Sequence, residues 1–179
     1  MSGTSGQAKR LEGINIRLSN QQYSGDIVYT THVQSYGWQG NENNQPTWRK
    51  NGVMSGTSGE AKRLEAIRIN LTGEMAKHYD IYYRVHAQSY GWLAWAKNGQ
   101  AAGTAGLAKR LEAIQIVVVA RGTTVQNNVN GIVSRYGRNY VSLNGASDVN
   151  VGGRETTNIT YRTHCLLYTS PSPRDISGS

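Results

Sequence analysis

The chain has 179 residues, of which 37% are hydrophobic, and this length suits one domain or slightly more. Phe is absent, but 11 Tyr and 4 Trp supply aromatic side chains that combine an apolar ring with a hydrogen-bonding group. The formal net charge of +8 would attract polyanions or simply give a soluble basic surface. No apolar run reaches the roughly 18 residues of a membrane helix, which excludes a helical membrane span.

One sequence block occurs three times along the chain. It reads "SGTSGQAKRLEGINIRL" from Ser2, "SGTSGEAKRLEAIRINL" from Ser55 and "AGTAGLAKRLEAIQIVV" from Ala102. The three stretches align without gaps. A fixed self-similarity of this kind indicates a repeat architecture, in which each copy is one supersecondary unit.

A second block lies between the copies of the first. It reads "IVYTTHVQSYGWQ" from Ile27, "IYYRVHAQSYGWL" from Ile81 and, in part, "ITYRTH" from Ile159. The repeat unit is therefore about 50 residues long. It divides the chain into the end of a truncated first copy (1–18), a full copy (19–71), a second full copy (72–119), a polar linker (120–158), the start of a next copy (159–164) and a tail (165–179).

The repeated blocks have the pattern of β-strands. In the second block the apolar and aromatic positions alternate, as in Ile27, Tyr29 and Val33. This period of two, with β-branched and aromatic residues, predicts a strand. The first block contains good helix formers in "AKRLEA", but its end also alternates and is β-branched, which predicts a strand there. Asn-Gly pairs at 51–52 and 98–99 and the Gly-Thr-x-Gly segments predict turns.

Short antiparallel strands in repeats predict an all-β fold. Three copies per unit favour a pseudo-threefold closed arrangement such as a β-prism or β-trefoil, with the first copy truncated. Closure hides strand edges that a stack of β repeats would leave exposed. The alternative is an open array in which each copy contacts only its neighbours.

The two ends of the chain differ from the repeats. The N-terminus has no basic segment followed by an apolar one, so no signal peptide is visible. The segment "CLLYTSPSPRD" looks like the in-frame translation of a sequencing-library adapter, and we predict that residues 165–179 are a non-native tail. The single cysteine, Cys165, falls in this tail, so we expect no disulfides and no thiol chemistry in the remainder.

The motif "YxxHxQSYGW", the Asn-Gly turn and "GTxGxAKRLEAI" together closely resemble the clostridial hydrophobic repeats with conserved tryptophan, called ChW repeats. The resemblance covers about 120 residues, and Gly37-Trp38 and Gly91-Trp92 match the defining Gly-Trp pair. It implies a secreted or cell-surface protein of Gram-positive bacteria, from the Clostridia, in which such repeats bind polysaccharide or protein. It brings no catalytic residues.

The repeated His, Gln, Tyr and Trp residues are the candidate binding site. On the first strand of each copy, His and Gln occupy the face opposite the alternating core positions. An aromatic plane beside amide and imidazole groups could bind a sugar; alternatively, these residues fill the core and satisfy backbone groups. The candidates are Trp38, Trp92, Tyr36, Tyr90, His32, His86, Gln34 and Gln88, with Trp48 and Trp95 as further aromatic candidates.

Each "AKRLE" block also repeats a basic pair followed by a glutamate. The glutamates are Glu12, Glu65 and Glu112. The basic pairs could form a threefold ring for an anionic wall polymer. The alternative, which we favour, is that the Arg and Glu residues pair between adjacent copies and fix their register.

Catalytic, metal and nucleic-acid readings find little support. The glutamates belong to a repeated framework and lack the asymmetric constellation that catalysis needs. No two of the four histidines have the close spacing of metal ligands, and no phosphate-binding loop is present. Glutamate in every basic block interrupts a continuous phosphate-facing stripe, which argues against nucleic acid. We therefore expect no enzyme activity and no cofactor.

The resulting hypothesis is a non-catalytic extracellular or cell-surface module for adhesion, which binds polysaccharide through one site per copy so that weak contacts add. The alternative is a structural spacer or protein-interaction array within a larger secreted protein.

Overall fold

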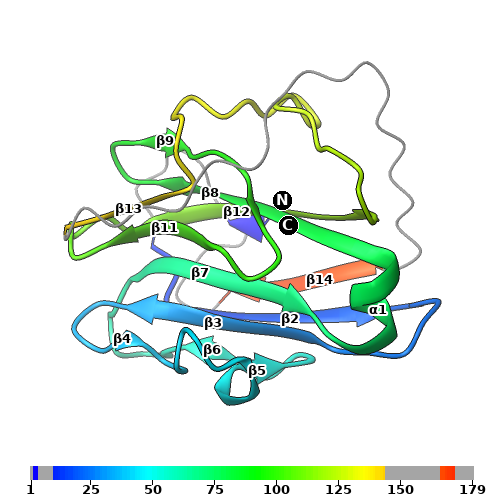
Figure 1. Cartoon of the computed structure of the whole chain (residues 1–179). Helices are drawn as coiled ribbons and strands as arrows, with labels where there is room; N and C mark the ends of the chain where they lie inside the picture. Colours follow the sequence, from blue (N-terminus) through cyan, green and yellow to red (C-terminus); the bar gives the residue numbers. More distant parts are fainter. Residues whose placement is uncertain (1, 4–9, 144–165, 172–179) are drawn as a thin grey trace.

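Mainly antiparallel β-strands are the predominant secondary structure of the computed structural model, which describes residues 2–3, 10–143 and 166–171 (Figure 1). The strands are β1 (Ser2–Gly3), β2 (Gly13–Ser19), β3 (Ile27–Val33), β4 (Gly37–Trp38), β5 (Arg49–Lys50), β6 (Ser55–Gly56), β7 (Leu64–Leu71), β8 (Tyr79–Ala87), β9 (Gly91–Trp92), β10 (Ala96–Lys97), β11 (Ala101–Ala105), β12 (Leu111–Ala120), β13 (Tyr140–Ser142) and β14 (Leu166–Pro171). Two short helices are η1 (Gln45–Thr47) and α1 (Gly73–His78). The predicted all-β class is confirmed.

The two full copies fold in the same way. In each copy the long strand from the second block pairs antiparallel with the long strand from the end of the first block, β3 with β7 and β8 with β12. The registers are equivalent, because Ile27 lies opposite Leu71 and Ile81 lies opposite Val118. The strand predicted at the end of the "AKRLEA" block is therefore present in both.

The Asn-Gly pairs form the predicted turns. Asn51 and Gly52 have φ of 47° and 87°, and Asn98 and Gly99 have φ of 45° and 90°. Two successive positive φ values are the geometry of a tight hairpin turn, which Asn-Gly adopts readily. Each turn follows a short strand that pairs with the long one, β5 with β3 and β10 with β8.

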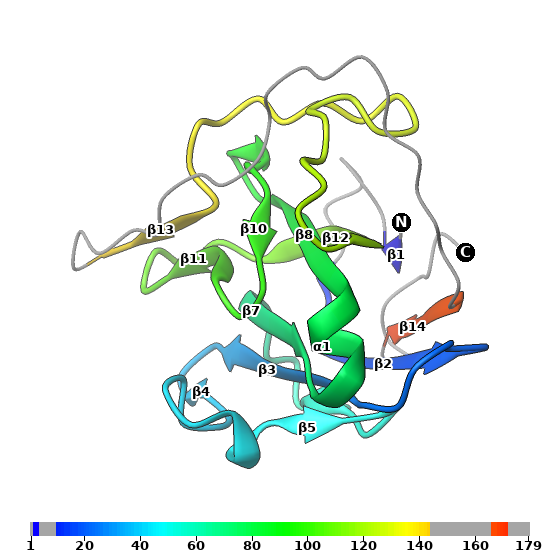
Figure 2. The same cartoon turned by 45° about the vertical axis from the view of Figure 1, so that its right-hand side comes forward.

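The first-block segments connect one copy to the next in a closed cycle. The Gly-Thr-x-Gly strand β6 pairs with β2 of the preceding copy, β11 pairs with β7, and β1 pairs with β12. Equivalent residues meet at all three junctions: Ile14 opposite Ser55, Ile67 opposite Ala102 and Ile114 opposite Ser2. The start of the described chain therefore pairs with its third copy, as Figure 2 shows for β1 and β12. A β-prism or β-trefoil geometry stays a prediction.

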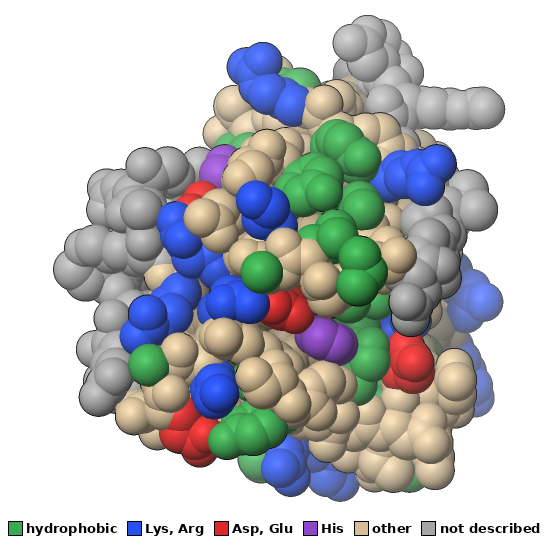
Figure 3. All heavy atoms as spheres, turned by 90° about the vertical axis from the view of Figure 1, so that its left-hand side faces the viewer, with side chains coloured by type: hydrophobic (Ala, Val, Ile, Leu, Met, Phe, Trp, Pro, Cys, Tyr) green, Lys and Arg blue, Asp and Glu red, His purple; other side chains and the backbone are tan. Residues whose placement is uncertain are grey.

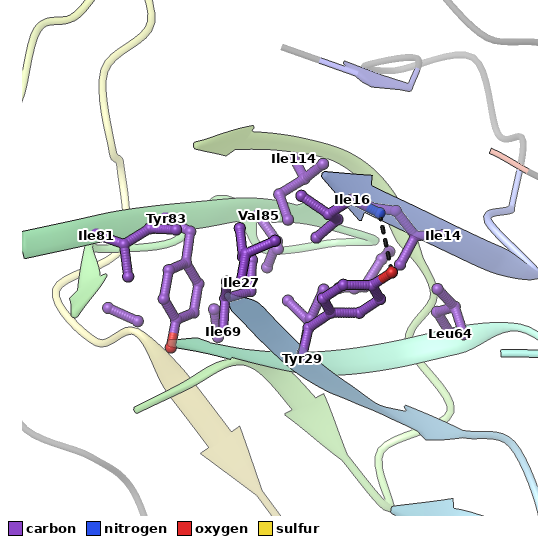
Figure 4. Packing of buried hydrophobic residues seen from close by; sticks show 14 of the residues in the cluster. Ile14, Ile16, Ile27, Tyr29, Leu64, Ile69, Ile81, Tyr83, Val85 and Ile114 are labelled. Carbon is purple, nitrogen blue, oxygen red and sulfur yellow. Dashed lines mark hydrogen bonds between the residues drawn. The ribbon is translucent and has the colours of Figure 1, made fainter. Parts of the chain in front are cut away.

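One hydrophobic core lies inside this cycle and receives side chains from all three copies. Its members include Ile14 and Ile16 of the first copy, with equivalent isoleucines and tyrosines of the other two (Figure 4). Tyr29 crosses from one copy to another, because its Oη accepts a hydrogen bond from the backbone N–H of Ile16 at 3.1 Å and donates one to the carbonyl of Val53. Both the alternating positions and the tyrosine hydroxyl thus hold the copies together.

The outer face of the long strands is also covered. The predicted inward positions of β3 are buried, but Val28 and Thr30 on the opposite face are only 7% and 1% exposed. In the other full copy, Tyr82 and Arg84 on that face are 3% and 0% exposed. Both faces of these two strands are therefore buried, so the alternation of their residues does not mark one face as exposed to solvent.

Part of the predicted polar linker packs on the third copy. Residues 121–143 are described, and their Val125 and Val129 are buried with Trp95, while β13 pairs in parallel with β11. The start of a next copy predicted at 159–164 lies outside the described residues, as does most of the predicted tail. Within that tail, β14 pairs with β2. The proposed domain boundaries stay predictions.

The short helix α1 was not expected from the sequence. It fills the junction before β8, and its Met75 is fully buried in the core. The junction is tied down by a hydrogen bond from the Met75 N–H to the carbonyl of Ser24 at 2.9 Å. None of the helices among the described residues has the length and apolar character needed to cross a membrane.

Candidate functional site

The repeated Gln-Ser-Tyr-Gly-Trp sequence forms the tip of a β-hairpin in both full copies. Ser35 and Ser89 have φ of 69° and 70°, and Gly37 and Gly91 both have φ of 73°. Glycine adopts this left-handed conformation without strain, and this explains its place before the tryptophan. The turn brings each Trp back against the histidine of the preceding strand, since Trp38 pairs with His32 and Trp92 pairs with His86.

Each histidine is held between its tryptophan and a buried glutamate. The His32 and Trp38 rings meet edge to face with centroids 5.6 Å apart, and the other copy repeats this contact at the same distance. His32 Nδ1 lies 3.1 Å from Glu65 Oε2, and His86 Nδ1 lies 2.9 Å from Glu112 Oε2. The histidine thus orients the tryptophan from below.

An arginine completes each group by binding the same glutamate. The Arg63 Nε–Glu65 Oε1 distance is 3.0 Å, and Glu65 is 3% exposed. Burial raises the pKa of Glu65, but the hydrogen bond from His32 and the charge of Arg63 lower it by more, so this pKa lies below its ordinary value. These Arg–Glu pairs lie within one copy, as do the pairs of Arg10 with Glu12 and Arg110 with Glu112. The expectation that they join adjacent copies was wrong.

The two glutamines link the hairpin tip to the "AKRLE" block. The backbone N–H of Gln34 donates to the carbonyl of Arg63, and that of Gln88 donates to the carbonyl of Arg110, both at 3.0 Å. Gln34 Oε1 also accepts a longer hydrogen bond from the Arg63 N–H. These main-chain hydrogen bonds join the hairpin tip to the "AKRLE" block in both copies.

The two full copies differ in what covers the tryptophans. In the third copy, residues 121–143 lie over the hairpin, and Trp92 and Trp95 are 9% and 0% exposed. The Arg135 N–H donates to the carbonyl of Trp92 at 2.9 Å, and the Tyr136 ring stacks edge to face on Tyr90. The candidate site of this copy is therefore closed by the chain itself.

Arg84 attaches this cover to the strands. Its side chain is fully buried, and its guanidinium lies 4.2 Å from the centroid of the Trp95 ring. It donates to Gln115 Oε1 within the sheet and, in the cover, to the Ser134 hydroxyl at 2.7 Å and to the backbone carbonyls of 127 and 132. A buried charge with this many acceptors holds the cover firmly.

In the second copy a short loop takes the corresponding place. Residues 39–47 contain the insertion between Trp38 and Trp48, and Trp48 Nε1 donates to the Asn41 carbonyl at 2.8 Å. In the third copy Trp95 Nε1 donates to the Gln126 carbonyl at 2.9 Å. The insertion and the covering segment therefore satisfy equivalent tryptophans, and Trp48 is only 6% exposed.

The loop leaves part of the second copy open. Trp38 is partly exposed and Tyr36 is 58% exposed. The Arg68 guanidinium lies 5.1 Å from the Trp38 ring centroid and is paired with Glu42 at 3.1 Å. Lys62 lies 5.6 Å from the Tyr36 ring centroid. We call these five residues the Trp38 surface.

Figure 3 views the molecule from the side on which β4, β9 and β13 lie in Figure 1. Hydrophobic side chains gather on this face among lysine and arginine side chains. The Trp38 ring also packs against a small cluster of Ala66, Ala101 and Tyr140, so β13 borders it on one side. An aromatic ring with charged hydrogen-bonding groups beside it is suited to a polar ligand that has an apolar face.

The sequence thus predicted the hairpin residues but not their neighbours. Arg68 and Glu42 were not singled out, because the other copies lack these residues and the comparison of copies selects only what is repeated. Arg84 was not singled out because Thr30 stands at its place in the second copy, although the partial copy from Ile159 has Arg162 there. Among the residues that the structure describes, no three His, Cys, Asp or Glu side chains are placed to hold a metal ion.

A comparison with protein families identifies the chain's repeats. The model described as Clostridial hydrophobic W matches residues 1–20, 32–73 and 86–120, together more than half of the chain. These spans contain both Gly-Trp pairs and all three "AKRLE" blocks. No curated protein and no solved structure matches this chain.

Proposed function

We propose, from the premise that this chain belongs to the Clostridial hydrophobic W family, that it is a non-catalytic binding module which acts in adhesion outside the cell or at the cell surface. Its ligand in this proposal is a cell-wall or extracellular polysaccharide, bound at the Trp38 surface. As a member of this family the chain is a repeat module of a clostridial protein. Its polysaccharide ligand and its location outside the cell are what we propose.

The observation that carries the proposal is the half-open tryptophan of the second copy. The Trp38 ring is held by its edge-to-face contact with His32 and by the Arg68 guanidinium over the ring, so little side-chain freedom is lost when a ligand binds. The apolar face of a pyranose ring can lie on an exposed aromatic ring, while its hydroxyl groups bind charged or amide side chains. The Arg68–Glu42 pair offers both donors and acceptors next to that ring.

The proposal places the site in one copy rather than in each. Trp92 and Tyr90 occupy the equivalent positions of the third copy, but residues 121–143 contact both. We therefore assign binding to Trp38 and Tyr36, with His32 and Gln34 in a supporting role. Trp48, Trp92 and Trp95, which are buried, receive a structural role in this proposal.

A matched pair of substitutions tests this assignment. Trp38→Phe and Trp92→Phe make the same change in equivalent positions, one open and one covered. We expect Trp38→Phe and Tyr36→Ala to reduce affinity for solubilised clostridial wall polysaccharide by about tenfold or more, because each removes contact area on the ligand. We expect Trp92→Phe to lower stability and leave the affinity of the folded protein unchanged.

The readout is isothermal titration calorimetry, which does not depend on the tryptophan that Trp38→Phe removes, with circular dichroism to show that each variant is folded. Equal losses of affinity in Trp38→Phe and Trp92→Phe would contradict a site restricted to the second copy. Saturable binding that Tyr36→Ala and Trp38→Phe leave untouched would move the site away from this surface.

A second candidate function is a structural spacer or protein-interaction array. The observation that favours it is the burial of three of the four tryptophans, at Trp48, Trp92 and Trp95. In that case the repeated residues serve mainly to build the core. A folded parent chain without saturable binding to any wall polysaccharide fraction would favour this candidate over glycan binding.

A further inference from the structure

Each full copy has an arginine at the same cross-strand pair beside its hairpin tryptophan, but on opposite strands of that pair. In the second copy Arg68 of β7 lies opposite Thr30, and in the third copy Arg84 of β8 lies opposite Gln115. The Arg68 guanidinium lies 5.1 Å from the ring centroid of the Gly-Trp tryptophan in its own copy, and the Arg84 guanidinium lies 5.9 Å from the equivalent ring. The two arginines therefore take equivalent places.

The third copy shows what an arginine binds at this place. Arg84 donates to oxygen atoms of the segment that covers the tryptophan, namely the Ser134 hydroxyl at 2.7 Å and the backbone carbonyls of 127 and 132. The arginine and the aromatic ring thus contact the same segment. By equivalence, the place in the second copy suits a ligand that presents an oxygen acceptor next to an apolar surface.

In the second copy the acceptor is a carboxylate. Arg68 Nη2 donates to Glu42 Oε2 at 3.1 Å, and Arg68 Nη1 donates to the carbonyl of Gly99 at 3.1 Å. The bond to Gly99 holds the guanidinium in place even when Glu42 moves away. Since a bond between an arginine and a carboxylate is charge-assisted, it is stronger than the bond to a neutral oxygen.

Glu42 is placed so that another carboxylate can replace it. Its side chain is 43% exposed, and in the described part of the chain Arg68 is its hydrogen-bond and ion-pair partner. The loop backbone is held independently, because the Asn41 N–H donates to the Thr47 hydroxyl and the Asn41 carbonyl accepts from Trp48 Nε1, both at 2.8 Å. Exposed ion pairs contribute little to stability, so Glu42 can leave Arg68 at small cost.

We propose that the ligand of the Trp38 surface is an acidic polysaccharide, whose uronic-acid carboxylate displaces Glu42 from Arg68 while the sugar ring contacts Trp38. This inference rests on the proposed function and names the class of its ligand. A uronic acid carries its carboxylate directly on the pyranose ring, so charge and apolar face lie as close together as Arg68 and Trp38 do. Lys62 beside Tyr36 adds a positive charge, and basic side chains are more numerous than acidic ones on the face in Figure 3.

The test compares an oligogalacturonate of one defined length with its methyl ester, which has the same rings but no charge. Binding to the full chain is measured by isothermal titration calorimetry. We expect the acidic oligomer to bind about fivefold or more tightly than the ester. Glu42→Gln should raise the affinity for the acidic oligomer by about threefold to fivefold, because the competing internal carboxylate is gone. Arg68→Gln should bind both oligomers equally.

Two substitutions on α1 are the matched controls for charge. Glu74→Gln and Lys77→Gln make the same changes in net charge as Glu42→Gln and Arg68→Gln, in an exposed pair outside the Trp38 surface. We expect both to keep the affinities and the acid preference of the parent chain. A gain in Glu74→Gln equal to that in Glu42→Gln would mean that net charge, and not displacement of Glu42, attracts the acidic oligomer, and this overturns the proposal.

Three other outcomes also overturn it: equal binding of both oligomers by the parent chain, binding of neither, or an undiminished acid preference in an Arg68→Gln chain that circular dichroism shows to be folded. If Arg68→Gln does not fold, Glu42→Gln decides, since Glu42 is exposed. The proposed function is tested separately with wall polysaccharide. Binding there that Trp38→Phe weakens, without an acid preference between the oligomers, keeps the glycan site and rejects the acidic ligand.

Discussion

The hydroxyl of Tyr29 provides the sharpest test of how the copies are joined. Tyr29→Phe keeps the buried ring and removes only the oxygen that accepts the Ile16 N–H at 3.1 Å and donates to the carbonyl of Val53. Tyr29 and Ile16 are both fully buried, so water cannot replace the lost partner. Leaving a buried backbone donor without a partner costs about 1–3 kcal/mol.

The expected loss of about 2 kcal/mol is large enough to measure by urea unfolding. With an m-value of roughly 1–3 kcal/mol/M for a protein of this size, the midpoint should fall by about 1 M. Tryptophan fluorescence reports the transition, because three of the four tryptophans are buried. Tyr83→Phe should give a loss of similar size, since Tyr83 makes the corresponding bond to the carbonyl of Gln100.

Tyr36→Phe is the matched control. It removes a tyrosine hydroxyl that bonds to Glu60 on an exposed surface, and we expect the unfolding midpoint to stay at the parent value. If the midpoint of Tyr29→Phe stays within about 0.2 M of the parent at an unchanged m-value, the hydroxyl does not join the first and second copies in the way that we infer.

Three further predictions concern charge, cover and backbone. The ordinary pKa values of Glu65 and Asp80 are 4.5 and 3.8. Burial raises the pKa of each carboxyl group, but hydrogen bonds and nearby cations lower it by more, so both pKa values are lowered in the folded protein. A carboxylate whose pKa is lowered by folding stabilises the protein fully at pH values above its ordinary pKa, and this stabilisation is lost as the pH falls through the folded-state pKa. The urea midpoint should therefore decrease when the pH is lowered below about 4.5. A midpoint that rises on acidification contradicts this sign. Arg84→Met should lower the free energy of unfolding by about 3 kcal/mol or more, because it leaves several buried acceptors in the sheet and in the cover unpaired. Limited trypsin digestion should then cut residues 121–143 first. Unchanged resistance to trypsin would mean that other contacts hold the cover. Gly103 and Gly122 have φ of 127° and 84°, but a Cβ added at Gly103 would lie only 2.4 Å from the Glu65 carbonyl oxygen, whereas one added at Gly122 would have no atom within 4 Å. Gly103→Ala should therefore lower stability far more than Gly122→Ala. Equal losses by urea unfolding would mean that the close approach does not matter.

The copies could be recognised from sequence because their signal is local and occurs more than once. Alternation in β3 and β8, the Asn-Gly turns and the glycine of the hairpin tip each depend on neighbouring residues only. Repetition then separates a structural requirement from chance. The same logic failed for Arg68, which stands at a position where the other copies have different residues. It also missed Arg84, whose place is taken by Thr30 in the second copy and by Arg162 in the partial copy from Ile159.

The direction of the Arg–Glu pairing also could not be read from the sequence. Arg63 and Glu65 are two residues apart on an extended segment, and the repeat allows pairing within one copy or between copies equally well. In the second copy the same carboxylate is also approached by His32, which lies opposite on the neighbouring strand and contacts its other oxygen. Only the register of β3 with β7 brings these groups together.

By itself the sequence determined the class of fold, the repeat and the residues of the hairpin tip, since these follow from short-range patterns. Only the tertiary structure decided which tryptophan is open. Trp38 and Trp92 stand in the same Gln-Ser-Tyr-Gly-Trp sequence. In the second copy the loop with the seven-residue insertion covers Trp48 and leaves Trp38 partly exposed, whereas in the third copy a distant segment, residues 121–143, covers Trp92. Exposure is a property of what packs on a residue from elsewhere in the chain, and local sequence does not encode those contacts.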